Sequence, residues 1–249
     1  MASEVTPFSG MLFLSAVVAG SLVPFVWRER PKAGSTAMAA TLSGLVLWAF
    51  GQVVVVSASD LDLMLAGFTV TMAGTAVVTA SWTVFAVQYT GHGAWVTRRR
   101  LALLTLEPLV LLALCVTNTH HGLMWLHPET TTAPGTGGLT YTTGLAIWGH
   151  ALYSYPLLLG AKGLLFKKFL ASRNVFRKRT FLFMTWSVAV FLGSLVSLFG
   201  LSPLPHFTLV PVLGLVIGVV SALLVPSNRF LASLPLDRLL GMFGSQAKS

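Results

Sequence analysis

Residues 63–89 read LMLAGFTVTMAGTAVVTASWTVFAVQY, a stretch of 27 residues without a charged side chain. A transmembrane helix needs about 20 consecutive, mainly apolar residues to cross about 30 Å of hydrocarbon. The stretch is too long and too continuously apolar for a membrane-barrel strand, in which about 10 residues alternate in hydrophobicity. It is followed by a basic cluster, Arg98–Arg100. This pattern predicts a membrane helix with positive charge just beyond one end.

The composition of the whole chain agrees with this prediction. Hydrophobic residues make up 55% of the 249 residues and charged residues only 9%, whereas soluble domains carry about 25% charged residues. So few charges cannot cover a surface that faces water, which excludes a soluble enzyme, a disordered chain and a coiled coil. The single cysteine, Cys115, excludes an internal disulfide and a cysteine-based zinc site.

The same length and hydropathy criterion predicts seven transmembrane helices. Backbone polar groups in lipid must be satisfied within the segment, so each apolar stretch is expected to be helical. We therefore expect an all-α integral membrane protein with a seven-helix bundle over residues 1–227 and a short amphipathic tail over 228–249. The predicted spans are roughly 7–27, 35–57, 63–89, 101–117, 144–166, 180–200 and 206–225.

The basic residues predict the orientation of the bundle. All 16 lie in or beside the connections after spans one, three and five, or in the C-terminal tail. The positive-inside rule then places the N-terminus outside and the C-terminus in the cytoplasm, in the plasma or inner membrane. Topology and contact with an anionic lipid bilayer explain these charges, so no nucleic-acid partner is expected. The residues are Arg28, Arg30, Lys32, Arg98, Arg99, Arg100, Lys162, Lys167, Lys168, Arg173, Arg177, Lys178, Arg179, Arg229, Arg238 and Lys248.

Two segments outside the spans have recognisable patterns. In the long outer loop, residues 118–143, Thr, Tyr and Leu flank a Pro/Gly turn, which is typical of a short β-hairpin. The hairpin would lie over the outer mouth of the bundle, and a flexible surface loop is the alternative. In residues 228–240, apolar side chains alternate with Arg and Asp, as in a short interfacial helix.

Glu107 is the clearest ionisable residue inside a predicted span. Such residues are costly in lipid and are functional candidates for that reason. It is expected to face the bundle interior, with Gln52, Trp82 or, less favourably, Lys162 as its partner. It is interpreted either as a proton-linked or polar-ligand group or as a structural carboxyl between helices.

A second group of polar and aromatic residues predicts a ligand pocket in the outer half of the bundle. His150 and Tyr153 are three residues apart and share a helix face. Together with Trp48 and Gln52 of span two, and His121 of the outer loop, they are the candidate ligand-binding residues. The alternative is an aromatic belt at the membrane interface that includes a satisfied histidine.

The sequence gives no reason to expect a metal, a cofactor or catalysis. Adjacent histidines at 120 and 121 are poor chelators, and no H-E-x-x-H motif is present. Span seven has no lysine to form a retinal Schiff base, and Lys162 is the only lysine inside any span. Walker and G-x-S-x-G motifs are also missing. We expect no metal, no cofactor and no enzymatic activity.

Several motifs resemble the seven-helix N-terminal region of prokaryotic histidine kinases. The resemblance covers residues 8–240 and implies a sensor that precedes cytoplasmic signalling domains, such as PAS, kinase or diguanylate cyclase domains, in a two-component system. The sequence has no H-box and no ATP-binding region, so we expect either a truncated chain or a free-standing member with a separate partner. The motifs are FAVQYTG (85–91), WVTRRR (95–100), EPL (107–109), TNTHHGLMW (117–125), Gly144, Trp148, His150, YSY (153–155), SALL (221–224) and LPLDR (234–238).

Three functions stay open from the sequence. The first is a receptor module that binds a small or lipid-borne ligand in its outer half and signals to a cytoplasmic domain or protein. The second is a small transporter or proton-coupled channel that uses Glu107. The third is an assembly protein without a ligand. Small residues in span three, among them Gly67 and Gly74, favour close helix packing within the chain. The pair Gly214 and Gly218 suits either such a contact or a homodimer.

Overall fold

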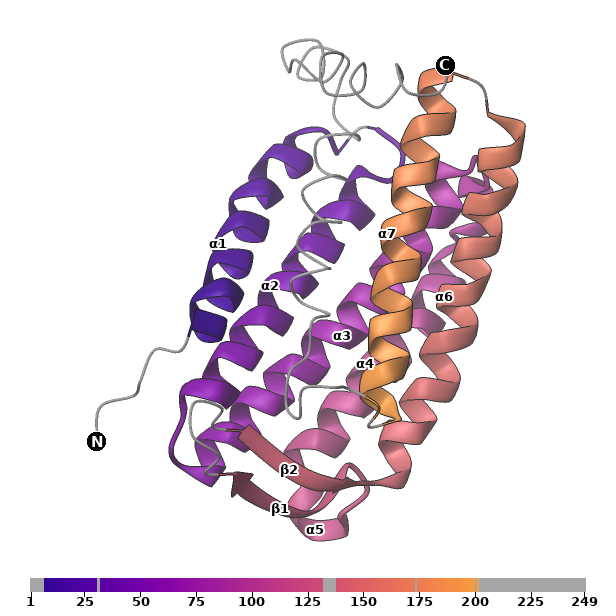
Figure 1. Cartoon of the computed structure of the whole chain (residues 1–249). Helices are drawn as coiled ribbons and strands as arrows, with labels where there is room; N and C mark the ends of the chain where they lie inside the picture. The colour runs from indigo at the N-terminus through magenta and orange to yellow at the C-terminus, as the bar shows by residue number, and fades with distance from the viewer. Residues whose placement is uncertain (1–6, 31, 132–137, 173, 200, 202–249) are drawn as a thin grey trace.

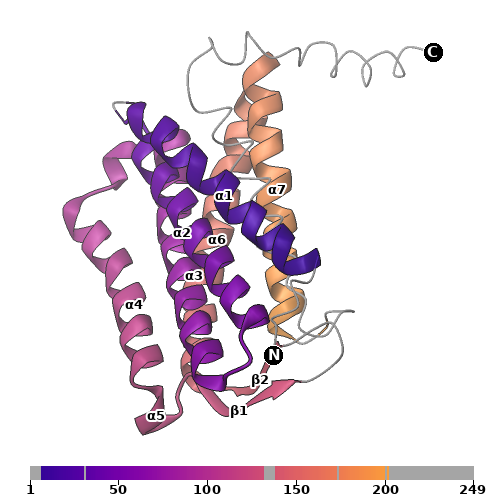
Figure 2. The ribbon, with the colours of Figure 1, turned by 90° about the vertical axis from the view of Figure 1, so that its left-hand side faces the viewer.

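A computed structural model describes residues 7–30, 32–131, 138–172, 174–199 and 201 of the chain. Long helices run alongside one another, and a β-hairpin closes one end of the bundle (Figures 1 and 2). We call this end the hairpin end and the opposite end, where α4 begins and α6 finishes, the basic end. The long helices are α1 (Pro7–Arg28), α2 (Ser35–Ser57), α3 (Leu61–Tyr89), α4 (Arg98–Val116), α6 (Leu145–Ala171) and α7 (Asn174–Leu198). The shorter elements are η1 (Gly93–Trp95), α5 (Asn118–His121), β1 (Trp125–Thr131) and β2 (Gly138–Thr143).

The described helices lie where the first six spans are predicted. By length and composition, three of them could cross a membrane, namely Ser9–Arg28, Ser35–Ser57 and Leu61–Tyr89. The helices α4 and α6 carry charged residues. The seventh predicted span, residues 206–225, and the predicted tail, residues 228–249, lie outside the described residues. The number of crossings and the orientation therefore stay predictions.

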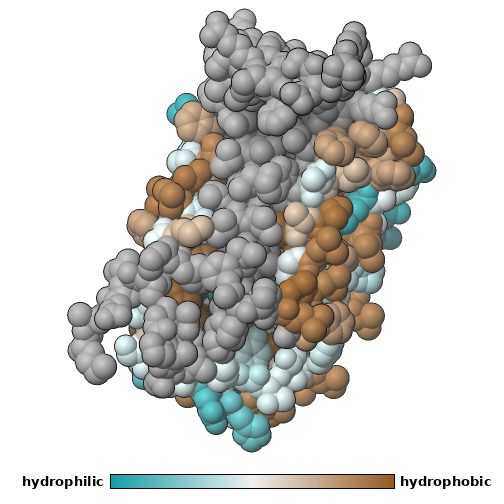
Figure 3. Space-filling model, in the orientation of Figure 1, coloured by the Kyte–Doolittle hydropathy of each residue, from teal (hydrophilic) through white to brown (hydrophobic). Residues whose placement is uncertain are grey.

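The outer faces of the helices are apolar. Leu103 and Leu109 of α4 are 67% and 65% exposed, and Leu152 of α6 is 78% exposed. Apolar residues form broad areas of the surface, whereas hydrophilic residues gather at the hairpin end (Figure 3). A soluble protein rarely exposes contiguous apolar patches of this extent. Together with the apolar helices, this surface indicates an all-α membrane protein.

The helices α2 and α3 pack so closely that glycine is required at their crossing. A Cβ atom on Gly51 would lie 2.6 Å from the carbonyl oxygen of Gly67, and one on Gly67 would lie 2.9 Å from that of Gly51. About two turns further along both helices, a Cβ on Gly74 would lie 2.7 Å from the carbonyl oxygen of Gly44. The close packing predicted for Gly67 and Gly74 is therefore present, and it is a contact within the chain.

Local sequence signals explain where two of the helices begin. The carboxylate of Asp60 accepts a hydrogen bond from the backbone N–H of Leu63 at 3.1 Å and so caps α3. The hydroxyl of Thr97 accepts one from the backbone N–H of Arg100 at 3.3 Å and caps α4. Both are side-chain caps that satisfy a free N–H of the first turn.

The hairpin predicted in the long loop is present. Strands β1 and β2 are antiparallel, with a bulge between Leu126 and Glu129. Buried Asn118 holds the approach to β1, since its Oδ1 accepts from Met124 N at 2.8 Å and its Nδ2 donates to Trp125 O at 2.9 Å. The ring of Phe68 on α3 lies 5.4 Å from that of Trp125 and 4.9 Å from that of Tyr141. These contacts hold the hairpin against the end of the bundle.

Candidate functional site

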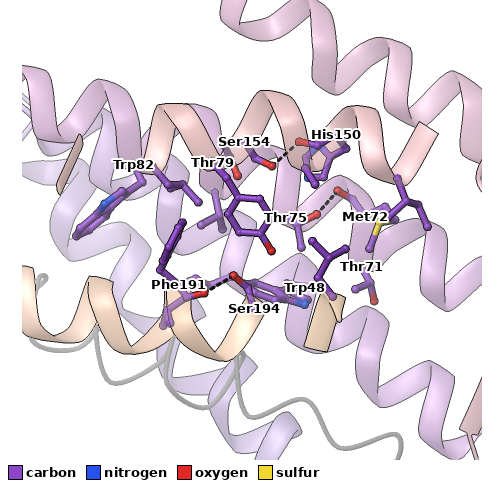
Figure 4. Close-up of a pocket in the computed structure, with 18 of the residues that line it drawn as sticks. Trp48, Thr71, Met72, Thr75, Thr79, Trp82, His150, Ser154, Phe191 and Ser194 are labelled. Atoms are coloured by element: carbon purple, nitrogen blue, oxygen red, sulfur yellow. Dashed lines mark hydrogen bonds between the residues drawn. The ribbon is translucent and has the colours of Figure 1, made fainter. Parts of the chain in front are cut away.

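A cavity of about 270 Å³ lies between α2, α3, α6 and α7. Side chains from these helices converge on it (Figure 4), and Tyr141 of β2 lines its hairpin end. Most of its wall is apolar, with polar groups placed along it. Ligand sites commonly combine a mainly apolar wall with a few such polar groups. Burial raises the pKa of Tyr141 to about 12, so at neutral pH its hydroxyl is uncharged.

Three threonine hydroxyl groups of α3 lie in a row along the cavity. Thr71, Thr75 and Thr79 line it from α3 at four-residue spacing, which places them on one helix face. Thr71 donates to Gly67 O at 3.0 Å, and Thr75 donates to Met72 O at 2.8 Å. Because these donors are used within the helix, the hydroxyl oxygens present acceptor capacity to the cavity.

Three of the five predicted ligand-binding residues line this cavity. Trp48 and Gln52 reach it from α2 and His150 reaches it from α6. The amide Nε2 of Gln52 donates to Thr71 Oγ1 at 3.3 Å. The structure thus brings together residues that are about 100 positions apart in the sequence.

The other two predicted residues lie elsewhere. The hydroxyl of Tyr153 donates to Leu104 O of α4 at 2.9 Å, and Tyr153 is not among the residues that line the cavity. The exposed ring of His121 lies 3.0 Å from Thr117 Oγ1 through Nε2, and its Nδ1 accepts from Leu123 N at 3.0 Å. His121 therefore shapes the turn before the hairpin and is not among the residues that line the cavity.

Glu107 has a partner that sequence reasoning missed. Its Oε1 lies 2.6 Å from Nδ1 of His150, and the two side chains are only 20% and 13% exposed. The expected partners, Gln52, Trp82 and Lys162, do not form this contact. The second oxygen, Oε2, is buried without a hydrogen bond in the described part of the chain. His150 thus belongs both to the cavity wall and to a polar link between α6 and α4.

A second polar contact strengthens this link beside Pro108. Proline has no N–H, so Pro108 leaves the carbonyl of Leu104, four residues earlier, without its helical donor. The hydroxyl of Tyr153 supplies the missing donor. His150 and Tyr153, three residues apart on α6, therefore contact α4 at two positions that are also three residues apart, Glu107 and Leu104. We call these two contacts, Glu107–His150 and Leu104–Tyr153, the α4 clamp.

Tyr153→Phe is expected to lower the free energy of unfolding by about 1 kcal/mol, the usual net value of one hydrogen bond. The cost should shrink in a Pro108→Ala background, because alanine at this position provides the N–H that Leu104 O lacks. Equilibrium unfolding of the four proteins in mixed micelles measures this double-mutant cycle. Equal costs in both backgrounds would contradict the assignment of Tyr153 as the substitute donor.

Lys162 lines the cavity, although the sequence suggests it only as a less favourable partner of Glu107. Its Nζ donates to Leu158 O at 3.3 Å and lies 4.4 Å from the ring centre of Phe191. A signal for it exists in the sequence, since His150, Ser154, Leu158 and Lys162 recur every four residues and all line the cavity. Four-residue spacing along one helix predicts a shared face.

No metal site is evident in the described residues. Within them, no three His, Cys, Asp or Glu side chains are grouped so that they could hold a metal ion.

Comparison with known proteins identifies a protein family that the chain matches over most of its length. A family model described as the N-terminal 7TM region of histidine kinase matches residues 11–235. No curated protein sequence matches the chain.

Proposed function

Because the chain belongs to the family of N-terminal seven-transmembrane regions of histidine kinases, we propose that it is a membrane sensor whose cavity binds a small or lipid-borne ligand. The signal passes to a cytoplasmic domain or protein, as in a two-component system. The C-terminal part of the chain, including residues 206–240, is the route that we propose for this output, given an outside N-terminus.

The position of His150 is the observation that carries this proposal. One imidazole lines the cavity and also contacts Glu107 of α4. A ligand can shift an equilibrium only if it binds two arrangements of the protein with different affinities. In this proposal a ligand in contact with His150 meets that condition, because it binds the ring with one affinity when the ring is paired with Glu107 and with another when that pairing is broken.

The limited packing of α4 supports its role as the moving element. Of its 19 residues, only Leu111 and Cys115 are buried. Figure 2 shows α4 at one edge of the bundle. The α4 clamp therefore provides a large share of the specific contacts that hold this helix to α6.

The test asks whether an occupied cavity changes α4. The protein is purified from membranes into nanodiscs, and bound small molecules are detected by native mass spectrometry. Ala151, which is buried and lines the cavity, is replaced by phenylalanine to fill it. We expect the wild type to retain a bound molecule, and hydrogen exchange in α4 to differ between loaded and emptied protein. Ala151→Phe should retain none.

Leu152→Phe is the matched control, because residue 152 is exposed on the neighbouring face of the same helix. It should behave as the wild type. Equal retention by Ala151→Phe, or identical exchange in α4 with and without the bound molecule, would refute the sensor proposal.

One observation favours a second function. The buried Oε2 of Glu107, which has no hydrogen-bond partner among the residues that the structure describes, is the kind of group that a proton-coupled transporter uses. Solute or proton flux in liposomes that disappears in Glu107→Gln would support transport over sensing.

A further inference from the structure

Building on the proposed function, we propose a chemical class for the ligand. It is a single-chain amphiphile with a carboxylate head, which the ammonium group of Lys162 binds at the basic end of the cavity. Its apolar chain extends between α3, α6 and α7 toward the hairpin end.

The charged residues that line the cavity indicate the charge of the ligand. Among the described residues that line the cavity, none is Asp or Glu, and Lys162 is the only lysine or arginine. An ammonium group has three donors, and the structure gives that of Lys162 one hydrogen bond, to a carbonyl of its own helix, and the face of Phe191. The ion pairs of the described residues do not include Lys162.

Lys162 is only partly exposed, and an ammonium group that is partly withdrawn from water without a counter-charge is costly. A ligand carboxylate removes this cost by forming a charge-assisted hydrogen bond. A neutral or cationic ligand of the same shape cannot do so. The wall therefore selects for an anionic group at the level of Lys162.

The length and volume of the cavity indicate the apolar part of the ligand. Lys162 and His150 both line it and are 12 residues apart on α6, which corresponds to about 18 Å of helix rise. The apolar part of the wall includes Leu45, Val190 and Phe191. At about 270 Å³, the cavity is slightly smaller than the usual range for ligand sites, about 300–1,000 Å³, and suits one chain better than a two-chain lipid.

We assign a carboxylate and not a phosphate as the head group because a single ammonium lines the described part of the cavity wall. Phosphate recognition typically uses several donors or the planar fork of arginine, and no arginine is among the wall residues that the structure describes. The single positive charge of Lys162 matches the single negative charge of a carboxylate head group.

The test uses the full chain in phosphatidylcholine nanodiscs and three probes of equal chain length, namely dodecanoate, dodecanol and dodecyl phosphate. Binding is measured by tryptophan fluorescence, because Trp48 and Trp82 line the cavity. We expect dodecanoate to bind at least about tenfold more tightly than dodecanol, from one charge-assisted hydrogen bond. Lengthening the carboxylate should raise affinity about fourfold per methylene until the cavity is full.

Two variants locate the head group. Lys162→Gln should lower the affinity for dodecanoate at least about tenfold and leave that for dodecanol unchanged. Lys167→Gln, on an exposed part of the same helix outside the cavity, should change neither. If Lys162→Gln does not fold, the comparison of the three probes on the native protein still decides the matter.

The outcomes separate the ligand class from the proposed function. Equal affinities for dodecanoate and dodecanol, or unchanged dodecanoate binding in Lys162→Gln, would overturn the ligand class and leave a ligand-binding cavity in place. Tighter binding of dodecyl phosphate would overturn the carboxylate. If no single-chain probe binds saturably, the carboxylate proposal fails, and the sensor proposal then depends on the mass-spectrometric test alone.

Discussion

Gly74→Ala is expected to destabilise the bundle by about 3 kcal/mol, the upper part of the range for overpacking a tight contact. A Cβ atom at residue 74 would meet the backbone of α2, with the α carbon of Trp48 only 2.8 Å away and the carbonyl oxygen of Gly44 2.7 Å away. Backbone atoms cannot move aside as a flexible side chain can. The two helices must therefore separate, and they form one wall of the cavity.

Gly160→Ala is the matched control. Residue 160 lies within α6, is exposed, and has no heavy atom within 4 Å of the position that a Cβ would take. Alanine has the higher helix propensity, so this change should leave stability unchanged or raise it by up to about 1 kcal/mol. Unfolding in mixed micelles, followed by circular dichroism, compares the two. Similar stabilities for Gly74→Ala and Gly160→Ala would show that the α2–α3 crossing is looser than described.

The sequence predicts the positions of the helices and strands better than it predicts which of them contact one another. The uncharged stretch 63–89 lies within α3, since length and hydropathy are properties of one segment. The hairpin follows from the same local logic, because a Pro/Gly turn between β-forming residues needs no information about the rest of the chain. The number of membrane crossings, by contrast, depends on a bilayer and on residues 206–225.

Contacts between helices depend on how each helix is rotated about its axis, and hydropathy does not determine that rotation. The sequence correctly places His150 and Tyr153 on one face, but that face meets α4, where His150 contacts Glu107 from 43 positions away. Tyr155, and not Tyr153, lines the cavity. From the sequence alone, Pro108 indicates that the carbonyl of Leu104 needs a hydrogen-bond donor from outside its own helix. The sequence does not indicate which residue provides that donor.

His150→Leu is expected to lower the free energy of unfolding by about 2–3 kcal/mol. The change leaves Glu107 partly buried without its partner, and removing one member of a buried polar pair is costly. The double variant Glu107→Leu/His150→Leu should recover most of that loss, because two apolar side chains in the same place leave no unpaired carboxyl. A double-mutant cycle of unfolding free energies measures the coupling. A double variant no more stable than His150→Leu alone would contradict a direct pairing.

The same double variant separates the stability of the clamp from its role in signalling. With the polar link replaced by an apolar contact, the protein should fold and bind dodecanoate, since Lys162 is unchanged. The ring that connects the cavity to α4 is gone, however, so dodecanoate should no longer alter hydrogen exchange in α4. Tyr153→Phe, which keeps His150, should retain that response. If dodecanoate alters α4 equally in the wild type and the double variant, the signal does not pass through His150, and the cavity must act on α4 through α3 instead.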